Sequence, residues 1–197
     1  RRSWLHRHPS NLPVHESWAR LFVSHSTSEA QGSSGNSNRA QLLNTFNEQV
    51  TRELTASQLY LAASLWCRHQ NLLGMAAYIR KESEEERGHA LALIDFANQR
   101  DMTLQLQALH APPHSWSSVL ALWESLLETE QKNTCALQYL ADLADAAHDH
   151  ALSALLDPFH LEQVESEDQL RTTIAKIADE AQTPGLLRQL DSEIAPN

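Results

Sequence analysis

The chain has 197 residues, 42% of them hydrophobic, and a formal charge of −10, which together predict one globular domain with an acidic surface. The acidic balance argues against nucleic-acid binding, which needs clustered lysine and arginine, and favours attraction of cations. The two cysteines form no CxxC pair, so neither a disulfide framework nor a thiolate zinc site is expected. No apolar run approaches the roughly 18 residues of a membrane span, so no membrane association is expected.

Residues 1–38 differ in composition from the rest of the chain. They are rich in serine, arginine and histidine, poor in acids, and end in the polar segment 32–38. This composition is typical of a transit peptide remnant followed by a flexible linker. We therefore expect a chloroplast or other plastid address for the domain formed by residues 39–197. A disordered extension on a cytoplasmic protein is the alternative.

Four long helical patterns follow, in which apolar residues recur every three or four positions. They are predicted to span residues 40–68, 72–100, 116–144 and about 150–180. Pro158 is expected to disturb the first turns of the last helix. Thr183-Pro184-Gly185 then interrupts the chain before a short amphipathic helix. The apolar residues of this fifth helix, expected to be buried against neighbouring subunits, are Leu186, Leu187, Leu190 and Ile194.

The lengths of the connections order these helices. Only a few residues join the first helix to the second and the third to the fourth, so each pair is predicted to be an antiparallel hairpin. Residues 101–115 join the second helix to the third and reach about 50 Å when extended. A helix of about 28 residues is about 42 Å long, so this link can cross the whole bundle. The predicted fold is therefore an all-α four-helix bundle with one long crossover and a short fifth helix.

The segment Lys81–His89 carries the main chemical signal. Glu82, Glu86 and His89 lie on the same helical stripe as Met75 and other apolar residues, and this stripe is the face expected to be buried. Burial of a carboxylate costs several kcal/mol, in order of magnitude, unless an opposite charge meets it. A metal ion is the partner that this pattern indicates.

The other three long helices show the same feature, because the apolar stripe of each one holds a polar residue near its middle. If the four helices pack with these faces inward, five side chains with oxygen and imidazole ligands converge on one interior site. They are Glu53, Glu86, His89, Glu130 and Gln163.

Several segments resemble the ferroxidase-centre motifs of non-haem ferritins, and the resemblance covers residues 40–195. They are Glu85-Glu86-Arg87-Gly88-His89, Glu53–Leu61, Glu130 and Glu162-Gln163-Val164. Leu156-Asp157-Pro158 and the segment 163–169 resemble cyanobacterial and algal ferritins more than animal ones. The resemblance implies a homo-oligomeric cage of 24 subunits that oxidises Fe(II) with O2 at a diiron centre and stores ferric mineral.

The resemblance also assigns roles to the residues of the predicted site. Glu53, Glu86 and His89 would hold a first iron, and Glu86 would bridge to a second iron held by Glu130, with Gln163 nearby. Tyr60 would be the adjacent aromatic residue that can donate an electron. Packing in the core with a hydrogen bond to Glu130 is the alternative role for Tyr60.

Some features depart from the ferritin patterns. The second Glu-x-x-His motif of bacterioferritins is absent and the chain has only two methionines, so no haem is expected. Ser166 replaces one acid of the third iron site found in many bacterial ferritins. The acids left to build such a site are Glu82, Glu85, Glu162 and Glu165. Asp157 is the candidate residue for an iron channel.

Two other functions fit the same fold. One is a structural ferritin subunit with little ferroxidase activity, and the other is a diiron-carboxylate oxidase that acts on an organic substrate. The presence of all five predicted site residues argues against the first. The absence of a second Glu-x-x-His motif and of a cysteine-rich module argues against the second.

Overall fold

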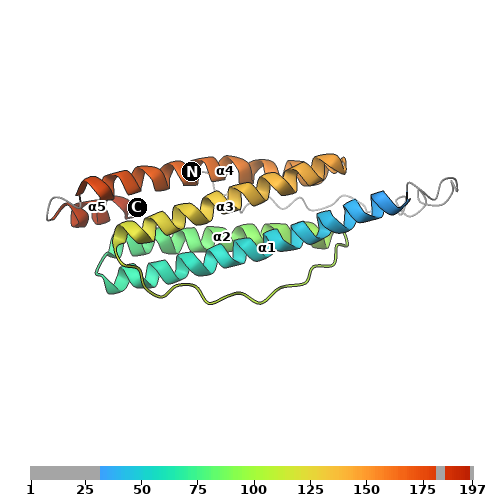
Figure 1. Cartoon of the computed structure of the whole chain (residues 1–197). Coiled ribbons are helices and arrows are strands. Elements are labelled where there is room, and N and C mark those ends of the chain that lie inside the picture. Colours follow the sequence, from blue (N-terminus) through green and yellow to red (C-terminus); the bar gives the residue numbers. More distant parts are fainter. Residues whose placement is uncertain (1–31, 181–184, 196–197) are drawn as a thin grey trace, which may run out of the picture.

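The computed structural model describes residues 32–180 and 185–195, and these residues form five α-helices. The helices are α1 (Gly32–His69), α2 (Leu73–Gln99), α3 (Val119–Ala146), α4 (His150–Glu180) and α5 (Leu186–Ile194). The four long helices lie side by side, and α5 packs at the end of the bundle where α4 finishes (Figure 1). The predicted all-α bundle with a short fifth helix is confirmed. No helix in the described part of the chain is long and apolar enough to span a bilayer.

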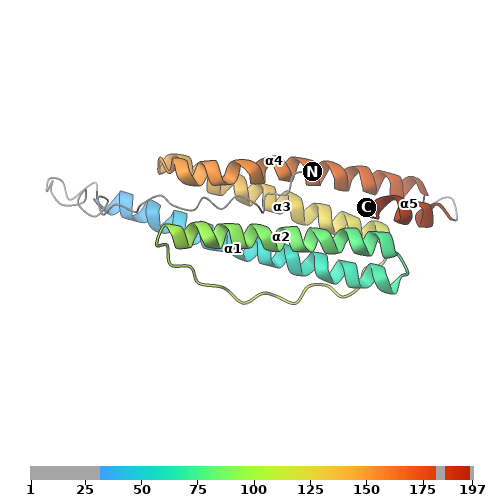
Figure 2. The same cartoon turned by 180° about the vertical axis from the view of Figure 1, so that it is seen from behind.

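The long connection from α2 to α3 runs the length of the bundle along its outside, as Figure 2 shows. The side chain of Asn47 on α1 holds this connection in place. Its Nδ2 donates to the carbonyl of Gln105 at 2.9 Å, and its Oδ1 accepts from the amide of Gln105 at 2.8 Å. The connection therefore returns the chain to the end where α2 began, so that α3 starts there, as the loop length predicted.

Three helices end in the same way without a glycine. Asn71, Asp101 and His148 have positive φ angles of 59°, 54° and 53°, and these residue types adopt the left-handed conformation more readily than most. After each of them the chain closes a Schellman-type hydrogen bond, for example from the amide of Leu72 to the carbonyl of Cys67 at 3.0 Å. These caps fix where α1, α2 and α3 stop.

Two helix starts and the course of α4 differ from the predictions. Helix α1 begins at Gly32 instead of residue 40, because a formed helix gains one hydrogen bond for each added residue and extends even through weak helix formers. Helix α3 begins at Val119 instead of residue 116, because Ser118 caps it by accepting from the amide of Ala121. Helix α4 runs through Pro158 without a break. Residues 1–31 of the predicted extension lie outside the described residues.

The core consists of two apolar clusters at opposite ends of the bundle. The first lies at the α5 end and includes Met75, Trp123 and Leu190. The second lies at the other end and includes Phe46 and Leu140. The middle turns of the four long helices lie between these clusters, and the polar residues of the predicted stripes are found there.

Helix α5 is fixed to its own bundle. Leu190 is 1% exposed, and Leu187 and Ile194 pack against the first apolar cluster. The carboxylate of Asp191 accepts the amide of Met75 at 2.7 Å and so caps the start of α2. The backbone of α5 passes so close to Gly74 that a Cβ there would lie 1.7 Å from the carbonyl oxygen of Asp191. The expectation that the apolar residues of α5 are buried by neighbouring subunits is wrong for Leu190, because its own chain already buries it, while Leu187 and Ile194 are only partly buried within the chain.

Candidate metal centre

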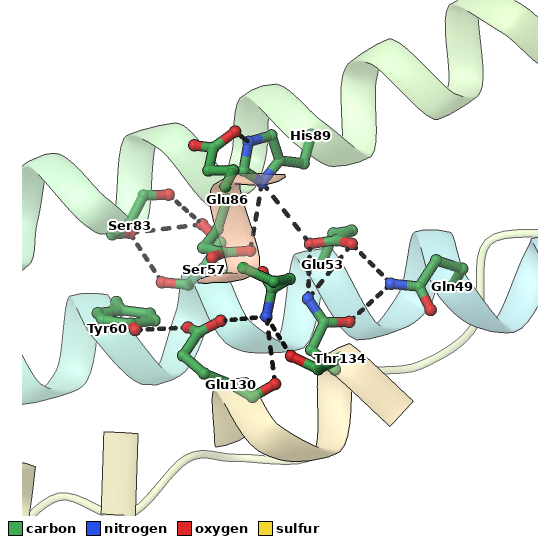
Figure 3. Close-up of polar contacts among 12 residues, drawn as sticks. Gln49, Glu53, Ser57, Tyr60, Ser83, Glu86, His89, Glu130 and Thr134 are labelled. Atoms are coloured by element: carbon green, nitrogen blue, oxygen red, sulfur yellow. Dashed lines mark hydrogen bonds and ion pairs between the residues drawn. The ribbon is translucent and has the colours of Figure 1, made fainter. Parts of the chain in front are cut away.

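Three of the predicted ligands meet in the middle of the bundle (Figure 3). Glu53, Glu86 and His89 each offer a ligand atom, and these atoms all lie within 4.8 Å of one another. The Nδ1 atom of His89 is 3.7 Å from Oε2 of Glu86 and 3.9 Å from Oε2 of Glu53. Glu53 is 0% exposed and Glu86 is 7% exposed. Such a group of buried carboxylates and an imidazole suits a divalent transition-metal ion.

Two small residues bring α1 and α2 together beside this group. The hydroxyl of Ser57 donates to the carbonyl of Ser83 at 2.8 Å, and the hydroxyl of Ser83 donates to the carbonyl of Ser57 at 2.7 Å. This reciprocal pair fixes the register of the two helices. It therefore sets Glu53 and Glu86 opposite each other, one turn away from the serines (Figure 3).

Glu86 has a buried carboxylate oxygen that no protein group hydrogen-bonds. Its Oε2 atom is buried and has no hydrogen-bond partner, a state shared by only one other side-chain atom in the described residues, the indole nitrogen of Trp123. An unpartnered buried polar atom is costly, and more so when it belongs to a charged group. The orphaned oxygen points into the ligand group, so these residues fit a bound metal.

The pKa values of the group also indicate that its buried carboxylates lack full compensation by positive charge. Burial raises the pKa of Glu53 well above its usual value, and the charge of Glu86 raises it further. Burial also raises the pKa of Glu86 and of Glu130. Burial lowers the pKa of His89, but its hydrogen bond to Glu162 and the nearby carboxylate of Glu86 outweigh this and raise it to about 11. Without metal the site therefore retains protons, which a metal ion must displace.

Glu130 faces the group from α3 and is held at both oxygens. The hydroxyl of Tyr60 donates to Oε1 at 2.5 Å, and the amide nitrogen of Gln163 donates to Oε2 at 2.9 Å. Gln163 also donates to the hydroxyl of Thr134 at 3.2 Å. The hydrogen bond between Tyr60 and Glu130, expected as the alternative to a redox role for Tyr60, is present. Gln163, one of the five predicted ligands, therefore turns its amide nitrogen toward the carboxylate of Glu130 as a hydrogen-bond donor.

The four acids predicted for a third iron site do not form a second compact group in the described residues. The carboxylate of Glu162 accepts a hydrogen bond from Nε2 of His89 at 3.1 Å, which leaves Nδ1 directed at Glu53 and Glu86. Burial raises the pKa of Glu82 to about 7, with the charge of Glu85 adding to it. Glu85 itself pairs with Lys81 on the surface, and Glu165 is exposed. Asp157 is exposed on α4.

Two amide residues beside the group were not predicted as site residues. Gln49 and Asn133 are 1% and 5% exposed, and both hydrogen-bond to Glu53. Gln49 lies one turn before Glu53 on α1, and Asn133 lies one turn after Glu130 on the apolar stripe of α3. Their positions on the buried stripes were the available signal, but the sequence does not say which groups they contact.

Comparisons with known proteins identify the family. The model of the ferritin-like domain matches residues 43–179. The bacterial non-heme ferritin of Bacteroides fragilis (strain 638R) is 32% identical over 137 residues, which cover 70% of this chain and 86% of that protein. The bacterial non-heme ferritin of Staphylococcus saprophyticus is 33% identical over 146 residues, covering 73% of this chain and 87% of that protein.

Solved structures agree with this result. The apo-ferritin from Pseudo-nitzschia multiseries is 51% identical, has a TM-score of 0.75, and the match covers 77% of this chain and 97% of that one. A PmFTN variant soaked in iron overnight is also 51% identical with a TM-score of 0.75, over 77% of this chain and 98% of that one. With its helical bundle and its buried carboxylate and histidine group, the chain therefore belongs to the ferritin family, among the non-haem ferritins and close to those of algae.

Proposed function

We propose that this ferritin oxidises Fe(II) with O2 at a diiron centre inside each subunit. Iron is the substrate, and it leaves the centre as Fe(III) for storage as a mineral. The observation that carries the proposal is the unpartnered Oε2 atom of Glu86. It lies 3.7 Å from Nδ1 of His89 within the group that also holds Glu53, and burial, followed by the charge of a further buried carboxylate, Glu130, raises the pKa of Glu86.

The residues of the centre divide the work between them. Glu53 and His89 would hold the first Fe(II), Glu130 would hold the second, and Glu86 would bridge the two. Each Fe(II) gives up one electron, and O2 is the acceptor. The protons that the carboxylates retain without metal leave when the irons bind, because a ligand carboxylate must be deprotonated.

Tyr60 and Gln163 orient Glu130, the residue proposed to hold the second iron. Their hydrogen bonds occupy one lone pair on each oxygen of Glu130 and fix the plane of its carboxylate. Burial and the neighbouring Glu130 raise the pKa of the Tyr60 hydroxyl, so it stays protonated and remains a donor. This position next to a ligand also supports the proposed role of Tyr60 as an electron donor.

The test is oxygen consumption after aerobic addition of Fe(II) to metal-free protein. Wild type should consume oxygen in a fast phase, and Glu86→Ala should lose this phase because its loss separates the two iron positions. Glu84→Ala is the matched control, since Glu84 lies on the same helix but is exposed and paired with Arg80. Assembly without a fast phase in wild type would instead support a structural subunit.

We further propose that the subunits assemble into a cage of 24 that encloses the mineral, and that residues 1–38 direct the protein to a plastid. The supports are the family and, for the address, the composition of that segment. Light scattering of the purified protein tests the cage, and a monodisperse monomer would refute it. A fluorescent protein fused behind residues 1–38 tests the address in algal cells, where a cytoplasmic signal would refute it.

A further inference from the structure

The carboxylate of Glu53 is held from the side that faces away from the other ligands. The amide nitrogen of Gln49 donates to its Oε1 at 2.6 Å, and Nδ2 of Asn133 lies 3.5 Å from Oε1 and 3.4 Å from Oε2. Gln49 and Asn133, here called the amide pair, are also joined to each other. The same nitrogen of Gln49 donates to Oδ1 of Asn133 at 2.6 Å.

We propose that the amide pair is a positioning device that selects which oxygen of Glu53 faces the metal. With Oε1 occupied by Gln49, the oxygen directed at Nδ1 of His89 is Oε2, at 3.9 Å. The pair thereby fixes Glu53 as a ligand that offers one oxygen in one orientation. This inference rests on the proposed function, because a positioned ligand needs a metal to position.

Hydrogen-bonding chemistry allows the pair only one arrangement. A metal-bound Glu53 is ionised and only accepts, so the amide nitrogens of both residues must face it in that state. The Oδ1 atom of Asn133 then faces Gln49 and needs a donor, which the second hydrogen of the Gln49 amide supplies. Rotating either amide by half a turn would set two donors or two acceptors against each other. The orientation of Glu53 is therefore determined by its neighbours and not by chance packing.

The amide pair also ties the ligand to a second helix. Gln49 and Glu53 belong to α1, whereas Asn133 belongs to α3. All three are buried, at 1%, 0% and 5% exposure, so water does not compete for these hydrogen bonds. Figure 3 shows the chain of contacts from Gln49 through Glu53 to His89 on α2. The geometry of the first iron position is thus set across three helices.

The consequence is an effect on metal affinity and on coordination geometry. Loss of the residues that orient metal ligands typically lowers metal affinity about 10- to 100-fold. Without the amide pair Glu53 can turn and offer both oxygens or neither. We therefore expect the affinity of the first metal position to fall at least about 10-fold and its ligand field to change.

The experiment uses Co²⁺ as a probe, because its visible absorption reports ligand number and geometry and it does not consume oxygen. Metal-free assembled protein is titrated with Co²⁺, and the spectrum of Glu86→Gln is subtracted to remove ions bound elsewhere. The test variants are Gln49→Met, Asn133→Leu and the double variant. The double variant removes both partners together and so leaves fewer unpaired groups than either single change.

Matched controls replace an exposed amide residue of each helix with the same apolar residue, as Gln58→Met on α1 and Gln138→Leu on α3. We expect the controls to match wild type. In the test variants the Co²⁺ bands should shift in position or intensity, and the dissociation constant of the first ion should rise at least about 10-fold. If the double variant does not fold, Gln49→Met alone decides the outcome.

Each other result overturns the proposal. Test variants that lose thermal stability but keep the wild-type Co²⁺ spectrum and affinity would show that the amide pair only supports the fold. If the Co²⁺ spectrum of wild type is the same as that of Glu86→Gln, the assignment of the metal centre is wrong, and the positioning role is refuted as well. The first result leaves the proposed ferroxidase function standing, so the two failures are distinguishable.

Discussion

Glu86→Gln should make the metal-free protein more stable and remove its response to metal. In wild type the buried Oε2 of Glu86 has no partner, and the pKa of Glu86 is raised, first because burial disfavours its charge. Glutamine has the same shape, carries no charge, and has an amide that can donate to Glu53. The substitution therefore replaces a costly pair of neighbouring carboxylates with a hydrogen bond.

The size of the effect follows from the unpartnered atom. A buried polar group without a partner costs about 1–3 kcal/mol, so metal-free Glu86→Gln should gain about this much stability. For a domain of this size, 1 kcal/mol corresponds to about 2–4 °C in Tm. A metal ion present at about 100 times its Kd stabilises the wild type by about 2.7 kcal/mol. The variant lacks the bridging ligand and should gain little, so metal should reduce or reverse the difference in stability.

The assay is thermal unfolding near neutral pH, first with a chelator and then with Zn²⁺ or Co²⁺. Glu84→Gln is the control, because Glu84 is exposed. Its unfolding free energy should stay within about 0.5 kcal/mol of wild type under both conditions. A metal-free Glu86→Gln protein that melts below wild type would refute the reasoning. It would mean that the apo site stabilises the charged carboxylate in a way that the structure does not show.

Four further outcomes are expected. Gly74→Ala should displace α5 and lower Tm by several degrees, because its Cβ meets backbone 1.7 Å away, whereas Gly88→Ala, with nothing within 4 Å, should not lower it; circular dichroism melting compares them. Burial raises the pKa of Glu82 from 4.5 to about 7, so the stability that protonated Glu82 contributes below pH 4.5 should be lost as the pH rises to 7. Metal-free Glu82→Gln should therefore become more stable relative to wild type over this range, as measured by chemical unfolding at a series of pH values. Asp157→Ala should slow oxidation only at low Fe(II), and initial rates equal to wild type at every iron concentration would show that iron enters elsewhere. Deletion of residues 1–38 should leave assembly and oxygen consumption unchanged, and loss of either would show that the segment contributes to the cage.

The sequence alone predicted the helices and the grouping of Glu53, Glu86 and His89 because both depend on one spacing. Residues three or four positions apart share a helix face, so a carboxylate such as Glu53 among apolar neighbours must be buried once the helix packs. The same reasoning located His89 one turn from Glu86. The antiparallel order of the helices followed from loop lengths, since only the link before α3 can span the bundle.

The sequence could not predict how the ligands are held. Gln49 and Asn133 are far apart in the chain, and their contact depends on the distance and rotation between α1 and α3. The carboxylate that pairs with His89 was expected to belong to a further metal site, but Glu162 lies against Nε2 because α4 faces α2 at this level. Such contacts depend on side-chain direction, which helical spacing does not specify.

The placement of the centre between two apolar clusters explains how the fold tolerates it. The buried carboxylates Glu53, Glu86 and Glu130 all have raised pKa values, so without metal they oppose folding once they ionise. The clusters on either side contain the fully buried Trp123 and Phe46, and they border this polar layer through Tyr60 and Phe159. The large apolar residues that stabilise the fold, such as Trp123 and Phe46, are therefore distinct from the candidate ligands. For this reason the ligand substitutions should leave the protein folded, and changes in iron oxidation can be assigned to the centre itself.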